Sequence, residues 1–193
     1  MMFNAAKSRV LNRGIPSDEF LKELVEWGQS APEEIFARND DPEDVFIRLA
    51  PILGPWTSVL HRRCGLLELL RVLAGFESSW NWNEGVDTTN QTSMKNIEGR
   101  ETGIFQVSFD SLRLDDTKNT GDDLHQCVMK YCGALDIHKF LDLMKSNHTF
   151  ALEYGARLLR NSFYWDGPVK RHEIDRWLLR DAVHEFELLL RLI

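Results

Sequence analysis

The sequence predicts a mainly α-helical fold with one small β region, and three observations support this. Apolar residues recur at helical spacing through most of the chain, whereas residues 78–108 lack that spacing and are rich in Gly and Asn. The 193 residues are 43% hydrophobic and 27% charged, as expected of a globular protein with a sizeable core. We therefore expect a helical bundle around one long central helix, followed by a β-hairpin near Ile97 and residues 104–107.

Residues 1–50 predict a helical extension packed on a main domain of residues 51–193. Ser17 is a good N-cap for a first helix that ends near Gln29. Two more helix starts, at residues 32–34 and 41–44, have acids in the first turn, where the helix dipole favours them. A group of helix breakers then separates the two parts, namely Pro51, Gly54 and Pro55.

The long helix is predicted over residues 56–77 and ends in a carboxylate. At about 100° per residue, Glu77 falls in the middle of the apolar stripe, and Glu68 and Arg71 fall on the opposite side. The stripe consists of Leu66, Leu69, Leu70 and Leu73. Burial would raise the pKa of Glu77, as general acid catalysis requires, although a helix end pointing into water is the structural alternative.

Helices resume after the irregular region. Their predicted starts follow Asp123, Asp136 and Thr149, and a final amphipathic helix is expected over residues 173–192, after a loop at 164–168.

Two short segments resemble the lysozyme-like superfamily. Residues 77–81 read ESSWN and residues 103–108 read GIFQVS. This pair is similar to goose-type lysozymes and lytic transglycosylases, in which a helix ends in Glu-Ser and a Gly-hydrophobic-hydrophobic-Gln segment follows. The resemblance covers residues 77–108 well and residues 150–169 loosely. It implies a lysozyme-like α+β fold and cleavage of a β-1,4-linked aminosugar polymer.

The resemblance also implies roles for individual residues. Glu77 would be the general acid, and the backbone of Gly103 to Phe105 would line a sugar cleft. Aromatic rings near Glu77 are candidate walls for sugar faces, although plain core or rim packing is the more common role of such rings. The substrate-binding candidates are Ser78, Trp80, Asp87, Gly103, Phe105, Gln106 and Tyr164, with Trp82 as a further ring.

A second carboxylate would decide the mechanism. An inverting base lies about 6.5–9.5 Å from the acid, and a retaining nucleophile about 5–5.5 Å. The candidates are Asp87, Glu98, Glu101 and Asp110. Goose-type enzymes have acids just before and just after the Gly-hydrophobic segment, which favours Glu101 and Asp110, although Ser108 occupies the second position itself. Lytic transglycosylases need no second acid, because the 6-hydroxyl of the substrate attacks.

Composition excludes several other function classes. The net charge of −7 argues against nucleic acid or an anionic membrane as partner. No run approaches the roughly 18 apolar residues of a membrane helix. HExxH and P-loop patterns are absent, and the three cysteines form no CxxC pair, so we expect no metal and no cofactor.

The expected partner is peptidoglycan, with a chitin-like glycan as the alternative, and an immunity or inhibitor protein is a further partner to seek. The N-terminus has no apolar core of the signal-peptide type, so we expect cytoplasmic synthesis and action on the cell wall after lysis or machine-mediated export. A phage endolysin and a secretion-system effector both fit. Two other classes stay open: a lysozyme-fold binding module without catalysis, and a helical interaction protein in which the two segments coincide by chance.

Overall fold

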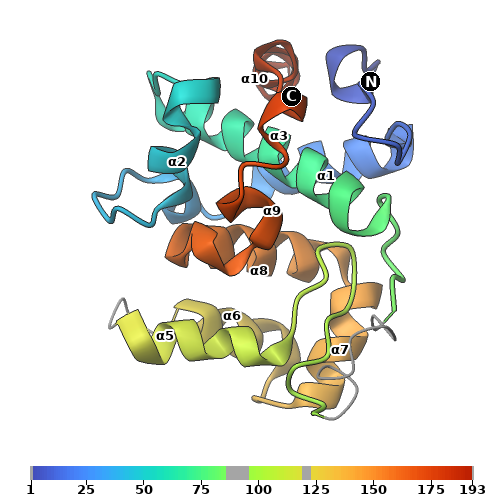
Figure 1. Cartoon of the computed structure of the whole chain (residues 1–193), viewed down its shortest axis with the longest axis vertical. Coiled ribbons are helices and arrows are strands. Elements are labelled where there is room, and N and C mark those ends of the chain that lie inside the picture. The colour runs from blue at the N-terminus through green and yellow to red at the C-terminus, as the bar shows by residue number, and fades with distance from the viewer. Residues whose placement is uncertain (1, 86–95, 119–122, 193) are drawn as a thin grey trace.

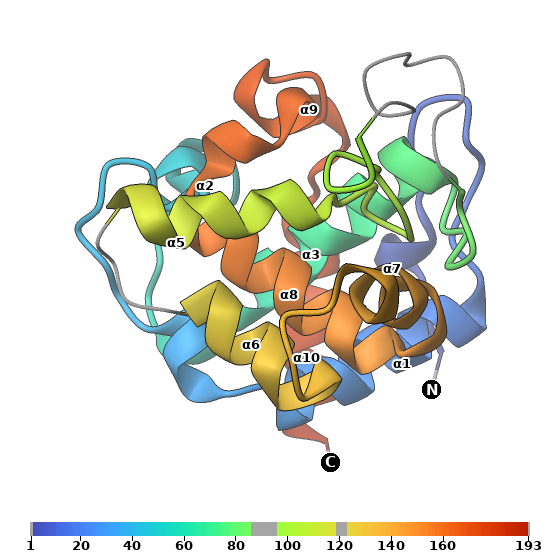
Figure 2. The same ribbon diagram turned by 90° about the horizontal axis from the view of Figure 1, so that it is seen from below.

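The computed structural model describes residues 2–85, 96–118 and 123–192, and it confirms that the chain is mainly helical (Figure 1). Helix α8 (His148–Asn161) crosses the middle of the molecule. On one side lie α3 (Val59–Ser78) and α10 (Arg180–Arg191), which pack on each other. On the other side, α6 (Asp123–Cys132) and α7 (Ile137–Ser146) lie beside α8 (Figure 2).

Apart from α1, the other helical elements are short. In the first third of the chain they are η1 (Ala5–Lys7), α1 (Asp18–Ser30), η2 (Glu33–Phe36) and α2 (Val45–Leu53). In the remainder they are η3 (Phe109–Leu112), α5 (Arg113–Lys118), η4 (Phe163–Trp165), α9 (Gly167–Lys170) and η5 (Asp175–Trp177).

Side-chain caps set several helix starts. The hydroxyl of Ser17 accepts the backbone N–H of Phe20 at 3.1 Å, which confirms the predicted start of α1. Asp136 caps α7 in the same way, by accepting from the N–H of Lys139 at 3.0 Å. The cap of α8 is Asn147, so that helix begins slightly before the predicted start.

The last helix is shorter than predicted, and α3 is the reason. A helix was expected from residue 173, but α10 begins at Arg180. The carboxylate of Glu68 accepts the N–H of Leu179 at 2.9 Å, and Arg71 donates to the carbonyl of Trp177 at 3.2 Å. These backbone groups are therefore bound by α3 instead of by their own helix.

The predicted β-hairpin is wrong for the residues that the structure describes. No strand is present there, and the segment holds a single antiparallel bridge in which Thr102 and Val107 exchange two backbone bonds of 3.1 Å. Gly103 and Gln106 within it have φ of +72° and +48°. Two left-handed residues close the chain so tightly that the bridge cannot extend into a ladder.

Helix α3 is the buried centre of the fold. Its residues from Cys64 to Gly75 are buried on all sides, including the face of Glu68 and Arg71 that the apolar pattern leaves out. Buried side chains from both sides of residue 50, such as Phe20 and Leu67, belong to one continuous core. The division of the chain at residue 50 stays a prediction.

No helix within the described residues has the length and apolar character needed to cross a membrane. The three cysteines, Cys64, Cys127 and Cys132, are buried free thiols.

Candidate active site

A cavity of about 370 Å³ lies at the C-terminal end of α3 and contains Glu77. Four parts of the chain meet there: the segment before α1, the end of α3, the bridged turn at 101–106, and the loop around α9. The lining residues are Arg13, Phe76, Glu77, Glu101, Phe105, Gln106, Trp165, Asp166, Gly167, Pro168 and Arg171. Three of them are carboxylic acids and two are arginines.

The end of α3 is held rigidly behind Glu77. Ser79 and Trp80 have φ of 56° and 61°, so the helix ends at Ser78. The Trp80 indole Nε1 donates to the carbonyl of Arg71 at 2.9 Å, and its ring lies over Gly75, where a Cβ would stand 2.5 Å from it. Trp80 is therefore buried against the last turns of α3, which it stabilises, and it does not line the cavity.

Ser78 joins the two segments of the sequence motif. Its hydroxyl lies 3.0 Å from the carbonyl oxygen of Ala74 and 2.9 Å from that of Ile104, and it accepts the N–H of Asn81 at 3.2 Å. Ser78 is buried, so it supports the site from behind. This contact gives a physical reason for the Ser after Glu77 and for the nearness of the GIFQV turn.

The bridged turn is wedged between α7 and α8. A Cβ on Gly103 would stand 2.6 Å from the carbonyl oxygen of Met144, so glycine is required there by space as well as by φ. The ring of Phe105 packs against Gly155 of α8. The Gln106 side chain donates to the carbonyl of Gly103 at 2.9 Å. Phe105 and Gln106 thereby form one wall of the cavity.

Glu77 has the electrostatic character of a general acid. It is half-buried, and burial is the main cause that raises its pKa from 4.5 to about 8. The negative charges of Asp166 and Glu101 raise the pKa further, while Arg13 and Arg171 lower it. A carboxyl in this environment holds its proton at neutral pH.

Asp166 is a site residue that the sequence did not indicate. It is the N-cap of α9 and accepts the N–H of Val169 at 2.8 Å, yet it is only 4% exposed. Burial raises its pKa to about 7, against the lowering effects of that bond and of Arg171. The sequence signal is an Asp-Gly-Pro cap at residues 166–168, and nothing local distinguishes it from an ordinary surface cap.

Of the acids predicted as the second carboxylate, only some lie where the structure describes them near Glu77. Glu101 lines the cavity with Glu77. Asp110 and Glu98 instead bind Arg113, at 2.9 Å and 3.1 Å, and line no part of that cavity. Asp87 lies outside the described residues.

The predicted aromatic walls also lie away from the cavity. Trp82 stacks on the ring of His148, with centroids 3.9 Å apart. Tyr164 is half-exposed and packs against Phe163. The aromatic side chains that line the cavity are Phe76, Phe105 and Trp165, and the sequence interpretation singled out Phe105 alone among them.

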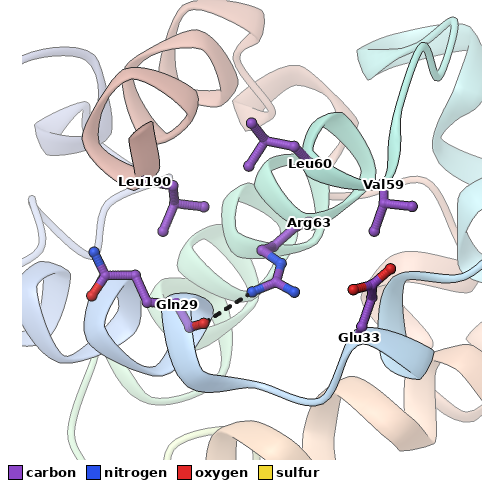
Figure 3. A pocket seen from close by; sticks show the side chains of 6 residues that line it. All are labelled: Gln29, Glu33, Val59, Leu60, Arg63 and Leu190. Atoms are coloured by element: carbon purple, nitrogen blue, oxygen red, sulfur yellow. Dashed lines mark hydrogen bonds between the residues drawn. The ribbon is translucent and has the colours of Figure 1, made fainter. Parts of the chain in front are cut away.

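A second and larger cavity, of about 550 Å³, lies between α1, η2, the start of α3 and the end of α10 (Figure 3). Arg63 projects into it, and its guanidinium donates to the backbone carbonyl of Gln29 at 3.2 Å. The rest of the lining is Glu33, the Gln29 side chain, Val59, Leu60 and Leu190. A single carboxyl lines this cavity, so it lacks the group of acids found around Glu77.

Comparison of the chain with protein-family models, with curated proteins and with solved structures gave no match. A function can therefore be inferred only from the chemistry of the site itself.

Proposed function

We propose that the protein is a glycoside hydrolase that cleaves a β-1,4-linked aminosugar polymer, peptidoglycan in the first place. The observation that supports this most strongly is Glu77, a half-buried acid with a pKa of about 8 in a cavity that it shares with Glu101. Paired acids in unlike environments are typical of glycosidases, because one must donate a proton and the other must act as an ion.

Glu77 is the proton donor in this proposal. The leaving sugar oxygen departs poorly as an alkoxide, so a proton must reach it as the glycosidic bond breaks. With a pKa of about 8, Glu77 is protonated at pH 7 and can supply that proton. The hydrogen bonds of Ser78 and Trp80 fix the end of α3, and this keeps the Glu77 carboxyl in place during the transfer.

Glu101 is the second acid, and Asp166 assists Glu77. Glu101 is partly exposed, so water can reach it, and as a carboxylate it would take a proton from the attacking water. Asp166 is buried and bound to α9, and its negative charge favours the protonated form of Glu77. In this mechanism the anomeric configuration is inverted.

The test is the release of soluble fragments from purified peptidoglycan, followed as loss of turbidity. Wild type should clear the suspension, and Glu77→Gln should lower the rate by about 10²–10⁴-fold, the usual contribution of a general acid. Asp142→Asn, which changes an exposed acid of α7, is the control and should retain full activity. Full activity of Glu77→Gln would remove Glu77 from the mechanism, and inactivity of wild type on both peptidoglycan and chitin would favour a binding protein.

Mass spectrometry of the products separates hydrolysis from transglycosylation. Hydrolysis leaves reducing ends, whereas attack by the substrate's own 6-hydroxyl leaves 1,6-anhydro ends. We expect reducing ends, because Glu101 lines the same cavity as Glu77 and in this proposal activates the attacking water. Anhydro ends from wild type and unchanged rates in Glu101→Gln would together assign the transglycosylase reaction.

A further inference from the structure

Arg13 extends from the N-terminal segment into the Glu77 cavity. A tight turn holds it there: the N–H of Val10 bonds to the carbonyl of Gly14 at 3.1 Å, and the N–H of Arg13 bonds to the carbonyl of Val10 at 3.0 Å. Gly14 has a φ of +98°, which favours glycine, and Val10 is fully buried. The turn is therefore anchored in the core, although Arg13 itself is exposed.

The two arginines of the cavity differ in their partners. Arg171 binds both carboxylate oxygens of Glu173, at 2.8 Å and 3.2 Å. Arg13, in contrast, makes no side-chain hydrogen bond or ion pair among the described residues. A guanidinium has five N–H donors in a planar fork that matches a carboxylate, so Arg13 offers an unused anion-binding group at the cavity.

The acids of the cavity do not cancel this charge. Burial keeps Glu77 protonated at pH 7, since its pKa is about 8, and leaves Asp166, with a pKa of about 7, charged in about half of the molecules. Glu101 is the third acid of the lining, and Arg171 adds a second positive charge to that of Arg13. An anionic group on a substrate can therefore approach Arg13 at neutral pH without strong repulsion.

We infer that Arg13 binds a carboxylate of the glycan and makes the site selective for carboxylate-bearing aminosugar chains over neutral ones. This inference rests on the proposed glycosidase function and adds the substrate class to it. In peptidoglycan the carboxylate belongs either to the lactyl ether of the sugar or to the attached peptide, whereas chitin has neither. A residue of the N-terminal 50 thus takes part in substrate choice.

The first experiment compares kcat/KM on soluble peptidoglycan strands and on neutral chitin oligosaccharides. Arg13→Gln should lose about tenfold on the strands, as expected for one charge-assisted bidentate contact, and nothing on the neutral oligomer. Arg13→Lys should recover part of the loss. Arg9→Gln, an exposed arginine of the same segment that lines no cavity described above, is the control and should match wild type. An equal loss on both substrates, or no loss, would overturn the inference.

A binding measurement separates this inference from the proposed reaction. In the Glu77→Gln background, calorimetry with strands should show about tenfold weaker binding when Arg13→Gln is added. Removal of the peptide frees the lactyl carboxyl, which the peptide otherwise holds as an amide. An effect of Arg13 that increases on stripped strands therefore assigns the lactyl group, and an effect lost on them assigns the peptide. If binding depends on Arg13 but the wild-type protein hydrolyses no glycan, the proposed glycosidase function is refuted and the inference about Arg13 is retained. Binding unaffected by Arg13→Gln would refute the inference whether or not hydrolysis occurs.

Discussion

Glu68 and Glu77 are both desolvated acids of α3, but they differ in their partners. Glu68 is fully buried and receives two hydrogen bonds of 2.7 Å from the guanidinium of Arg71, and it also accepts the N–H of Leu179 at 2.9 Å. Burial raises its pKa, and the bonds from Arg71 oppose that rise. Glu68 therefore connects α3 to the segment before α10.

Glu77 meets a different environment on the opposite face of the helix. Nine residues separate the two acids, which at about 100° per residue is a rotation of half a turn. Among the described residues, no ion pair neutralises Glu77, and two further acids, Glu101 and Asp166, act on it. Desolvation alone therefore does not make an acid reactive. A buried carboxylate bonded to arginine is structural, whereas one left beside other acids retains a proton that it can transfer.

The largest expected effect is the loss of stability when Glu68 is replaced. Glu68→Gln should lower the free energy of unfolding by about 3–5 kcal/mol, because Arg71 would keep an uncompensated buried charge. Urea denaturation at pH 7 measures this change. A loss below about 1 kcal/mol would show that Arg71 finds another partner and would weaken the contrast with Glu77.

Removal of the charge from Glu77 should have the opposite sign. The native pKa of about 8 exceeds the ordinary 4.5, so the native state holds the proton more tightly and wild-type stability falls as the pH rises from 4.5 to 8. Glu77→Gln should lack this fall and exceed wild type at pH 8.5 by about 1–3 kcal/mol, allowing for the partial exposure of the carboxyl. At pH 4 the two proteins should be nearly equal. If the difference in unfolding free energy between Glu77→Gln and wild type is the same at pH 4 and at pH 8.5, a raised pKa of Glu77 is excluded.

Ser78→Ala tests the support behind Glu77. Loss of the hydroxyl that links Ala74 and Ile104 should cost about 1–2 kcal/mol in unfolding free energy and should lower activity in the folded protein. Ser146→Ala is the matched control, because the exposed Ser146 hydroxyl of α7 donates to the carbonyl four residues earlier and has no second partner among the described residues. Equal, small effects from both substitutions would mean that the link to Ile104 is unimportant.

Asp166→Asn should give the smallest effect, a shift in pH dependence. Asn is a good N-cap, so the bond to the N–H of Val169 can persist while the negative charge is lost. Without that charge the pKa of Glu77 should decrease, and the alkaline limb of kcat/KM against pH should move below the wild-type position near pH 8. An unmoved limb would show that burial alone sets the proton affinity of Glu77.

The sequence by itself determined the local features of this fold and one site residue. Helical spacing and short-range caps such as Ser17 and Asp136 predicted most helices, because these signals depend on neighbours within a few residues. The apolar stripe of α3 likewise predicted a desolvated Glu77. The resemblance placed Gln106 near Glu77, although the segment around Gln106 was predicted to be a hairpin and is a tight turn.

Only the tertiary structure decided which other groups surround Glu77. Glu101 lines the cavity whereas Asp110 binds Arg113, and Asp166 and Arg13 arrive from the two ends of the chain. The late start of α10 has the same origin, since Glu68 binds the N–H of a residue more than a hundred positions away. Such pairings depend on how helices pack, which residue spacing within one helix does not encode.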